Sequence, residues 1–222
     1  MIICSEMINE VKIDSFDDIC SSFSIWIIQY CSHNYASPLY MVWYSDPDTE
    51  GRHAFMLDKA GGIFAVTDLS KIKEILLKNE DKIQQPNNLK NWLACFGSII
   101  PEYAESYNVG QIENDIRAND LFDESIKQLT GFVNLFGDFV YQSKDNLLYE
   151  RDLKNKYINM VCKYYYQYIH SSHYKNKDQY NQKNKPKLEI NNLELLHAFI
   201  KIRYVIEENI SIVYLQNRVQ TI

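Results

Sequence analysis

The stretch from Phe122 to Val140 constrains the fold of this chain more than any other. Its apolar residues recur alternately four and three positions apart, and a second apolar stripe runs beside the first. The two stripes are Phe122, Ile126, Leu129, Val133, Phe136 and Val140, and Phe132, Leu135 and Phe139. This spacing predicts a helix that is apolar over much of its circumference, and such a helix is usually central rather than peripheral. Gly131 and Gly137 lie within it and indicate close helix packing or a bend.

The first third of the chain has a different residue pattern, with short runs of β-branched and aromatic residues bounded by turn-forming residues. We expect strands in residues 24–31, 39–44, 53–57 and 63–67. The sequences DPDTEG at 46–51 and KAGG at 59–62 indicate hairpin connections. Residues 21–30 are also compatible with a helix that begins near Phe16, so both interpretations stay open.

Helical periodicity returns after Thr67. Apolar residues three and four apart predict a helix from Leu69 to Leu76, which Asp68 or Ser70 would cap. Further helices are expected in residues 87–96, 153–170 and 192–208, and a polar loop is expected near 171–187. The run ISIVYL at 210–215 either extends the last helix or adds a strand, and residues 209–222 stay unassigned.

These elements predict an α+β fold class, with an N-terminal antiparallel β-sheet or hairpins followed by a mainly helical C-terminal part. We expect a single domain over residues 1–222, sheet-rich in 1–68 and helix-rich in 69–222. A chain of 222 residues with 46% apolar residues can bury a stable core without a metal or a disulfide.

Nothing in the sequence points to a membrane or to export. The N-terminus lacks a basic region followed by an apolar run, and no apolar stretch reaches the roughly 18 residues that a membrane span needs. The five cysteines are scattered and never form C-x-x-C, which suits free thiols in a reducing compartment. We therefore expect a soluble, cytoplasmic protein.

The net charge of −6 hides a strong asymmetry along the chain. Residues 1–150 hold 23 acidic and 11 basic side chains, whereas residues 151–222 hold 6 acidic and 12 basic ones. The most acidic window, residues 102–124, contains Glu102, Glu105, Glu113, Asp115, Asp120, Asp123 and Glu124 against the single basic Arg117. A face of this kind would dock a basic partner and speed association. Tyr103 and Tyr107 add a residue type enriched at interface hot spots. An ordinary solvated surface with acids at a helix N-terminus explains the same residues equally well.

A second candidate surface is the segment 163–187, where lysines alternate with tyrosines. The residues are Lys163, Lys175, Lys177, Lys183, Lys185 and Lys187, with Tyr164, Tyr165, Tyr166, Tyr168, Tyr174 and Tyr180. Lysines neutralise phosphates and aromatic rings stack on bases, so this pattern suits single-stranded nucleic acid. Several of these tyrosines also lie on the predicted core stripe of their helix, which favours a structural role.

Metal and nucleotide motifs give weaker signals. His170 and His173 are spaced for one helical turn, but two imidazoles do not make a zinc site. The acidic turn at 46–51 lacks the twelve-residue arrangement of an EF-hand. Neither G-x-G-x-x-G nor a P-loop occurs, and Gly61 with Gly62 indicates a tight turn.

Catalytic candidates are no stronger. Cys31 and His33 would share one face of a strand, which chance proximity also explains. We therefore predict no enzyme, no catalytic residue, no metal and no cofactor.

Two segments carry a family resemblance. LTGFVNLFGDFVYQ at 129–142 and NLLYERDLKNKYINMVCKYYYQYI at 146–169 resemble the helical part of immunity proteins encoded beside bacterial polymorphic toxins, particularly those of contact-dependent growth inhibition systems. The resemblance implies a stoichiometric inhibitor that binds one cognate toxin domain in the cytoplasm. Many such toxins are nucleases with basic faces, which an acidic surface complements. The alternative is a nucleic-acid-binding protein that uses segment 163–187.

Overall fold

A computed structural model describes residues 15–46, 51–84, 86–96, 99–143, 146–170 and 185–215. The chain forms two compact units: unit 1 comprises residues 1–106 and 209–222, and unit 2 comprises residues 107–208. The expectation of a single domain over residues 1–222 stays a prediction. The tip of the acidic turn at 47–50 and most of the predicted polar loop, residues 171–184, lie outside the described residues.

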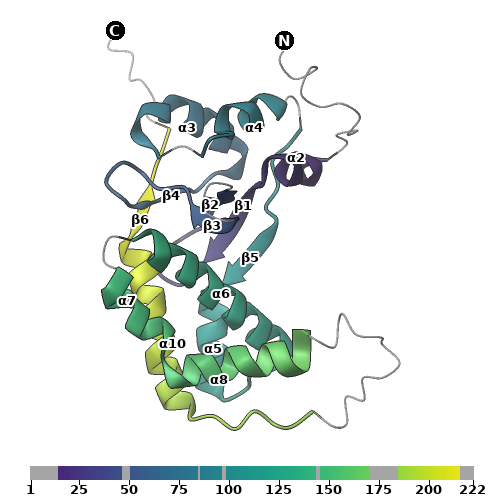
Figure 1. The fold of residues 1–222 in the computed structure, drawn as a ribbon, viewed down its shortest axis with the longest axis vertical. Helices are drawn as coiled ribbons and strands as arrows, with labels where there is room; N and C mark the ends of the chain where they lie inside the picture. Colours follow the sequence, from purple (N-terminus) through teal and green to yellow (C-terminus); the bar gives the residue numbers. More distant parts are fainter. Residues whose placement is uncertain are drawn as a thin grey trace. The chain divides into compact units, whose positions relative to one another are not determined.

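Unit 1 is built on a six-stranded sheet (Figure 1). Its strands are β1 (Ile25–Cys31), β2 (Leu39–Asp46), β3 (Arg52–Phe55), β4 (Ile63–Val66), β5 (Glu105–Asn108) and β6 (Ile210–Ile212). The strand order is β5-β1-β2-β4-β6, and β3 also pairs with β2. The pairs β1–β2, β2–β3 and β2–β4 are antiparallel, whereas β4 and β6 run parallel. The strands expected in the first third of the chain are therefore confirmed.

The predicted fold class, an N-terminal antiparallel sheet followed by helices, is wrong. The sheet is mixed, and it takes β5 from the middle of the chain and β6 from beyond the last helix. Ile210 of β6 lies opposite Ile63 of β4 in a parallel pair. A strand of three residues contains too little alternation to identify its partner or its direction, so the periodicity of the sequence misses this pairing. The architecture is mixed α/β.

Both interpretations of residues 21–30 turn out to hold in part. Helix α2 (Phe16–Phe23) begins at Ser15, whose hydroxyl accepts a hydrogen bond from the Asp18 N–H in a capping box. It ends at Ser24, which takes the left-handed conformation with φ of 54°. That reversal lets β1 begin one residue later at Ile25.

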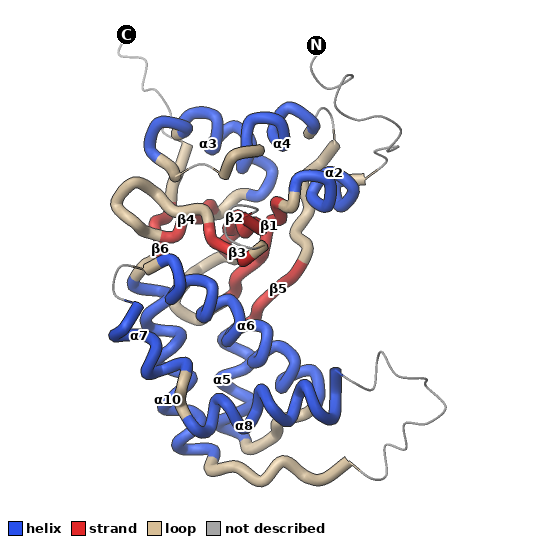
Figure 2. Tube along the Cα trace, in the orientation of Figure 1, coloured by secondary structure: helices blue, strands red, loops and turns tan. Residues whose placement is uncertain are grey.

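Three helices of unit 1 lie on one side of the strands (Figure 2). They are α2, α3 (Ile72–Lys78) and α4 (Leu89–Cys95), with short 3-10 turns η2 (Leu69–Lys71) and η3 (Glu80–Lys82) around α3. Their buried residues form one apolar cluster with Ile27, Val42 and Phe64 of the sheet. Trp92 of α4 is fully buried, and its ring centroid lies 4.7 Å from that of Phe96. The helices predicted near 69–76 and 87–96 are confirmed.

Unit 2 is helical. It contains α5 (Val109–Ala118), α6 (Asp123–Gln142), α7 (Asn146–Leu153), α8 (Lys156–Tyr164), the π-helix η4 (Tyr165–His170) and α10 (Asn192–Glu208). As predicted, α6 is central, because it packs against every other helix of the unit. A Cβ on Gly131 would lie 2.9 Å from the ring of Tyr107, so this glycine allows a close approach of a tyrosine from β5, and not of another helix as predicted.

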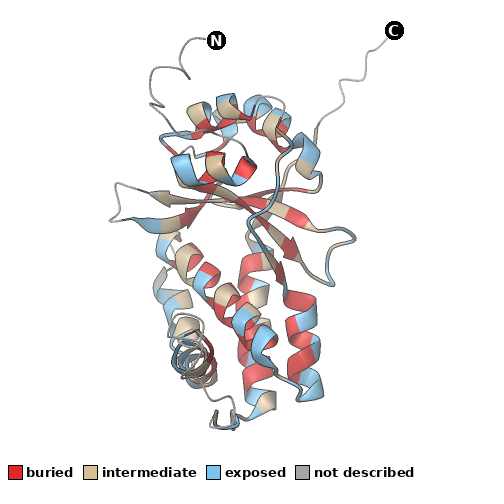
Figure 3. Ribbon diagram, turned by 90° about the vertical axis from the view of Figure 1, so that its right-hand side faces the viewer, coloured by how far each residue is buried: buried red, intermediate tan, exposed pale blue. Residues whose placement is uncertain are grey.

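Buried residues gather on the inward faces of these helices and on the strands (Figure 3). No described helix combines the length and apolarity that crossing a lipid bilayer requires.

Candidate functional site

The predicted acidic window does not form one exposed face. Glu113 lies on α5 and is only 8% exposed. Its carboxylate accepts hydrogen bonds from Arg117 at 2.5 Å, and it pairs with Arg203 of α10 at 3.1 Å. Glu113 therefore joins two helices of unit 2 instead of facing a partner.

Asp115 is also taken up inside unit 2. It is 7% exposed, and its two carboxylate oxygens accept hydrogen bonds from Gln111 at 2.7 Å and from Ser125 of α6 at 2.5 Å. Sequence reasoning misses this burial, because it assigns no helix to residues 109–118 and therefore no inward face. Glu113 and Asp115 are structural residues.

Three acids of the window lie exposed at the start of α6. Asp120 and Glu124 are exposed, and Glu124 forms an ion pair with Lys127 at 3.6 Å. Asp123 forms an ion pair with Lys185. Acids in the first turn of a helix favour its positive end, so their position has a structural explanation.

The last two acids, Glu102 and Glu105, belong to unit 1. They alternate with two exposed apolar side chains, Ile100 at 76% and Tyr103 at 44% exposure. The segment is anchored to β1, because the Ala104 N–H donates to the Ile27 carbonyl at 2.8 Å. We call Ile100, Glu102, Tyr103 and Glu105 the β5 edge, since they lead into the strand at one end of the sheet order.

The charge of the protein resides in unit 1. Unit 1 holds 15 acidic and 9 basic side chains, a balance of −6, whereas unit 2 holds 14 of each. Residues 107–150 of unit 2 are acidic as well, with 8 acidic and 3 basic side chains, but the basic residues that follow within unit 2 balance them.

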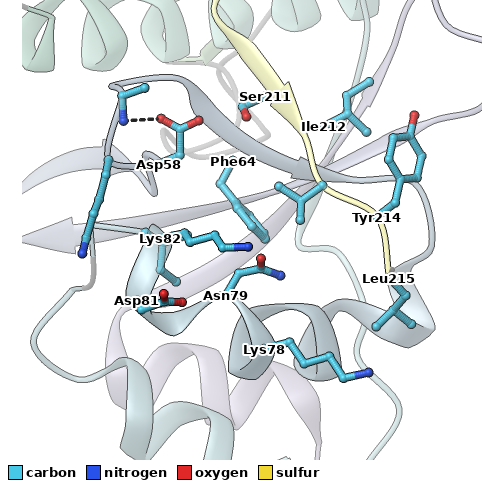
Figure 4. A pocket seen from close by; sticks show the side chains of 14 residues that line it. Asp58, Phe64, Lys78, Asn79, Asp81, Lys82, Ser211, Ile212, Tyr214 and Leu215 are labelled. Atoms are coloured by element: carbon cyan, nitrogen blue, oxygen red, sulfur yellow. Dashed lines mark hydrogen bonds between the residues drawn. The ribbon is translucent and has the colours of Figure 1, made fainter. Parts of the chain in front are cut away.

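At the opposite end of the sheet order, unit 1 contains an open groove of about 1070 Å³ (Figure 4). Its walls are the turn at 58–60, the end of α3 with η3, and β6 with the three residues that follow it. Phe64 and Ile83 are buried and form its apolar floor, while Val213 and Leu215 are partly exposed. We call this the β6 groove. Sequence reasoning missed it, because its walls come from segments about 130 residues apart.

The turn beside the groove uses Asp58 for its own structure. One carboxylate oxygen accepts the Ala60 N–H at 2.8 Å and the Gly62 N–H at 2.9 Å. Gly61 has φ of 97°, so the predicted tight turn is confirmed. A Cβ on Gly62 would lie 3.1 Å from Ser211 of β6, which explains the second glycine.

The lysines of the groove are placed differently. Lys78 pairs with Glu74 at 2.8 Å. Lys59 and Lys82 form no ion pair within the described part of the chain, and their backbones are joined by a hydrogen bond of 2.9 Å from the Lys59 N–H to the Lys82 carbonyl. The Asp58 carboxylate keeps its negative charge when the N–H groups of the turn bind it, so Asp58 and Asp81 balance the charges of Lys59 and Lys82 around the groove.

The lysine and tyrosine segment is only partly described. Tyr164 is buried, and its hydroxyl donates to the Pro186 carbonyl at 2.7 Å. Lys185 lies 5.3 Å from the Tyr164 ring centroid. These two residues serve the packing of unit 2. Tyr165, Tyr166 and His170 form an aromatic cluster on η4 with ring centroids 5.2 to 5.6 Å apart.

The remaining candidates gain no support. His173 lies outside the described residues, and no group of three potential metal ligands occurs among the described ones. Burial raises the pKa of the Cys31 thiol, which opposes the thiolate form that a nucleophile needs. Burial likewise raises the pKa of Cys20 to about 12, as expected for an inert buried thiol.

Comparison with known proteins gives a fold and no family. No protein-family model matches the chain, and no curated protein matches it. Among solved structures, the chain is similar to the C-terminal domain of SatS, described in a crystal structure in complex with bromine. The TM-score is 0.62 at 15% sequence identity, and the match covers 88% of this chain and 97% of that chain. At this identity the likeness shows a shared fold alone.

Proposed function

We propose that this protein is a cytoplasmic inhibitor that binds a basic protein partner, and that the partner is a toxin domain of the kind the resemblance to immunity proteins implies. The observation that carries the proposal is the β5 edge, where Glu102 and Glu105 stand exposed among the exposed apolar side chains of Ile100 and Tyr103. The proposed docking surface therefore contains only two of the seven acidic residues expected from the sequence, Glu102 and Glu105.

The chemistry of the β5 edge suits a protein partner. Interfaces are richest in aromatic anchors surrounded by polar groups, and Tyr103 with its flanking carboxylates has that pattern. The net charge of −6 on unit 1 supplies a field that attracts a basic face over a longer range. Contact area would then set the lifetime of the complex, and the acids would set its rate of formation.

The test uses the proposed toxin domain, which is the C-terminal domain encoded immediately upstream of the gene for this protein. The toxin domain carries a mutation that abolishes its catalytic activity. Glu102→Lys combined with Glu105→Lys should slow association about tenfold at low salt, because it reverses the steering field. The wild-type rate should fall as salt rises, and the rate of the variant should depend on salt much less.

A matched control reverses two exposed acids of unit 2, Asp120→Lys with Glu124→Lys. This variant should associate at nearly the wild-type rate. If only the control variant associates more slowly than the wild type, the docking surface lies on unit 2. If calorimetry detects no one-to-one complex, the inhibitor proposal is rejected.

One observation favours a second candidate function, binding of single-stranded nucleic acid. The cluster of Tyr165, Tyr166 and His170 presents partly exposed rings on a π-helix, and such rings can stack on bases. The engaged Tyr164 and Lys185 reduce the surface available for it. Titration of a labelled oligothymidine at low salt tests this candidate. The wild-type protein should bind the oligonucleotide, and the double variant Tyr165→Ala with Tyr166→Ala should bind it more weakly.

A further inference from the structure

The outer edge of β6 is open along its backbone. The Ile63 N–H donates to the Asn209 carbonyl at 2.6 Å, and the Val213 N–H donates to the Ala65 carbonyl at 2.9 Å. Since backbone groups alternate in direction along a strand, the N–H and C=O of Ile212 point away from β4. Among the described residues, no strand pairs with that side of β6.

The side chains along β6 divide between the two faces of the sheet. Val213 packs against the apolar cluster of the face that the helices cover, to which Phe64 belongs. Alternation places Ile210, Ile212 and Tyr214 on the opposite face. Figure 4 shows the side chains of Ile212 and Tyr214 pointing away from Phe64. The two isoleucines are partly exposed and Tyr214 is 61% exposed, so this face of β6 is an uncovered apolar strip.

The sequence of this edge lacks the residues that usually prevent sheet edges from pairing. Proteins protect an edge strand with charged side chains, prolines or bulges. The run ISIVYL at 210–215 contains no charged residue, no proline and no glycine. Most of its side chains are β-branched or aromatic, which favours pairing with another strand. The edge of β6 is therefore suited to a further uncharged strand.

The charges of unit 1 make β6 the end of the sheet where two copies of the chain can meet. Unit 1 has a net charge of −6, so two copies repel each other over most of its surface. The β5 edge adds to this repulsion because it carries two exposed glutamates. Beside β6, by contrast, Asp58 and Asp81 balance Lys59 and Lys82.

The exposed strip of β6 is also complementary to itself. Antiparallel pairing centred on Ile212 places this residue opposite Ile212 of the partner subunit, and it places Ile210 opposite Tyr214 of the partner subunit. Residues with outward backbone groups then face each other as hydrogen-bonded pairs, and their side chains meet on one face of the sheet. A two-fold axis through this centre uses each β6 edge once, so the assembly closes at two copies.

We propose that this protein forms a symmetric dimer in which the β6 edges of two copies pair antiparallel about Ile212 and join the two sheets into one. The paired segment is short, so the dimer forms at high protein concentration and dissociates on dilution. This inference goes beyond the inhibitor function and does not depend on it, because no second protein takes part.

Sedimentation equilibrium of the full-length protein, from about 1 μM to about 1 mM, tests for the dimer. The data should fit an equilibrium between monomer and dimer with no larger species. A protein that stays monomeric over this range overturns the proposal. Growth beyond the dimer also overturns it, because open-ended assembly requires β6 to contact a different surface of the next copy.

Opposite charges at one position test the register. Ile212→Lys and Ile212→Glu each place two like charges face to face across the two-fold axis, so each variant alone should dimerise at least about tenfold more weakly than the wild type. An equimolar mixture of the two variants should regain a dimer of about wild-type affinity, because a lysine then faces a glutamate. Damage to the fold would not be repaired by mixing. Absence of this recovery overturns the pairing about Ile212.

The matched control for the charge variants is Leu77, a side chain that is 51% exposed on α3 of the same unit. Leu77→Lys and Leu77→Glu should each dimerise as the wild type does. If they weaken the dimer as much as the Ile212 variants do, the effect is one of total charge and the assignment to β6 is overturned.

A further pair of variants isolates the backbone contact. Ile212→Pro removes the outward N–H and should weaken the dimer about tenfold, while the inward bonds to β4 remain. Ile212→Val keeps the N–H and a β-branched side chain, so its dimer should be within about twofold of wild type. Circular dichroism checks that both variants are folded. Equal dimerisation by wild type and Ile212→Pro overturns strand pairing.

Discussion

The two ends of the sheet in unit 1 differ in the chemistry that they offer. The β5 edge presents Glu102 and Glu105 beside exposed apolar side chains, whereas the β6 groove presents Lys59 and Lys82 above an apolar floor. One strand order therefore ends in an acidic surface on one side and, on the other, in a hollow where Asp58 and Asp81 balance the two lysines. The net charge of −6 on unit 1 is thus not spread evenly over its two sheet ends.

This difference bears on how an open sheet avoids unwanted pairing. Edge strands invite other strands, and proteins protect them with short lengths, charges or covering segments. β6 has three residues and β5 has four, so both edges are short. The carboxylates beside β5 add a negative charge that repels an acidic segment, whereas the charges beside β6 balance.

The largest expected effect comes from the buried core of unit 1. Trp92→Ala should lower the free energy of unfolding by about 3–5 kcal/mol, because it empties a fully buried site between Phe16 and Phe96. Urea unfolding followed by far-ultraviolet circular dichroism measures the loss. Leu77→Ala, at a side chain that is 51% exposed on α3, should change the stability by less than about 0.5 kcal/mol.

The acidic window shows what the sequence could and could not predict. The sequence locates the carboxylates but not their surroundings, since Glu113 and Asp115 face inward only because Arg203 and Ser125 arrive from other helices. Periodicity predicts the strands of the first third of the chain and the long helices, but it misses β5 and the ten-residue α5. It also misses the parallel β6, because a three-residue run after a long helix has no signal that identifies β4 as its partner.

The second prediction separates buried from exposed acids within that window. Glu113→Gln should destabilise the protein by about 2–3 kcal/mol, because it leaves the largely buried Arg203 with only the more distant Glu207 carboxylate at 3.9 Å. Glu102→Gln should change stability by less than about 0.5 kcal/mol and instead slow partner association. Thermal and urea unfolding measure the first effect, and stopped-flow mixing measures the second. If Glu113→Gln is as stable as the wild type but associates with the partner more slowly, Glu113 belongs to the docking surface.

The smallest expected effect concerns pH and a histidine that belongs to neither edge. His53 of β3 stacks on Trp43 with ring centroids 4.0 Å apart, and burial lowers its pKa from the ordinary value of 6.5. The unfolded chain therefore takes up a proton at a higher pH than the folded protein does. Stability should fall as the pH drops through about 6.5 and should stop falling once the folded histidine also protonates.

His53→Gln should flatten this dependence, whereas His33→Gln, at an exposed side chain, should leave it in place. Urea unfolding at a series of pH values from 7.5 to about 5.5 measures both variants. A pH dependence that survives in His53→Gln would show that another group causes the loss of stability.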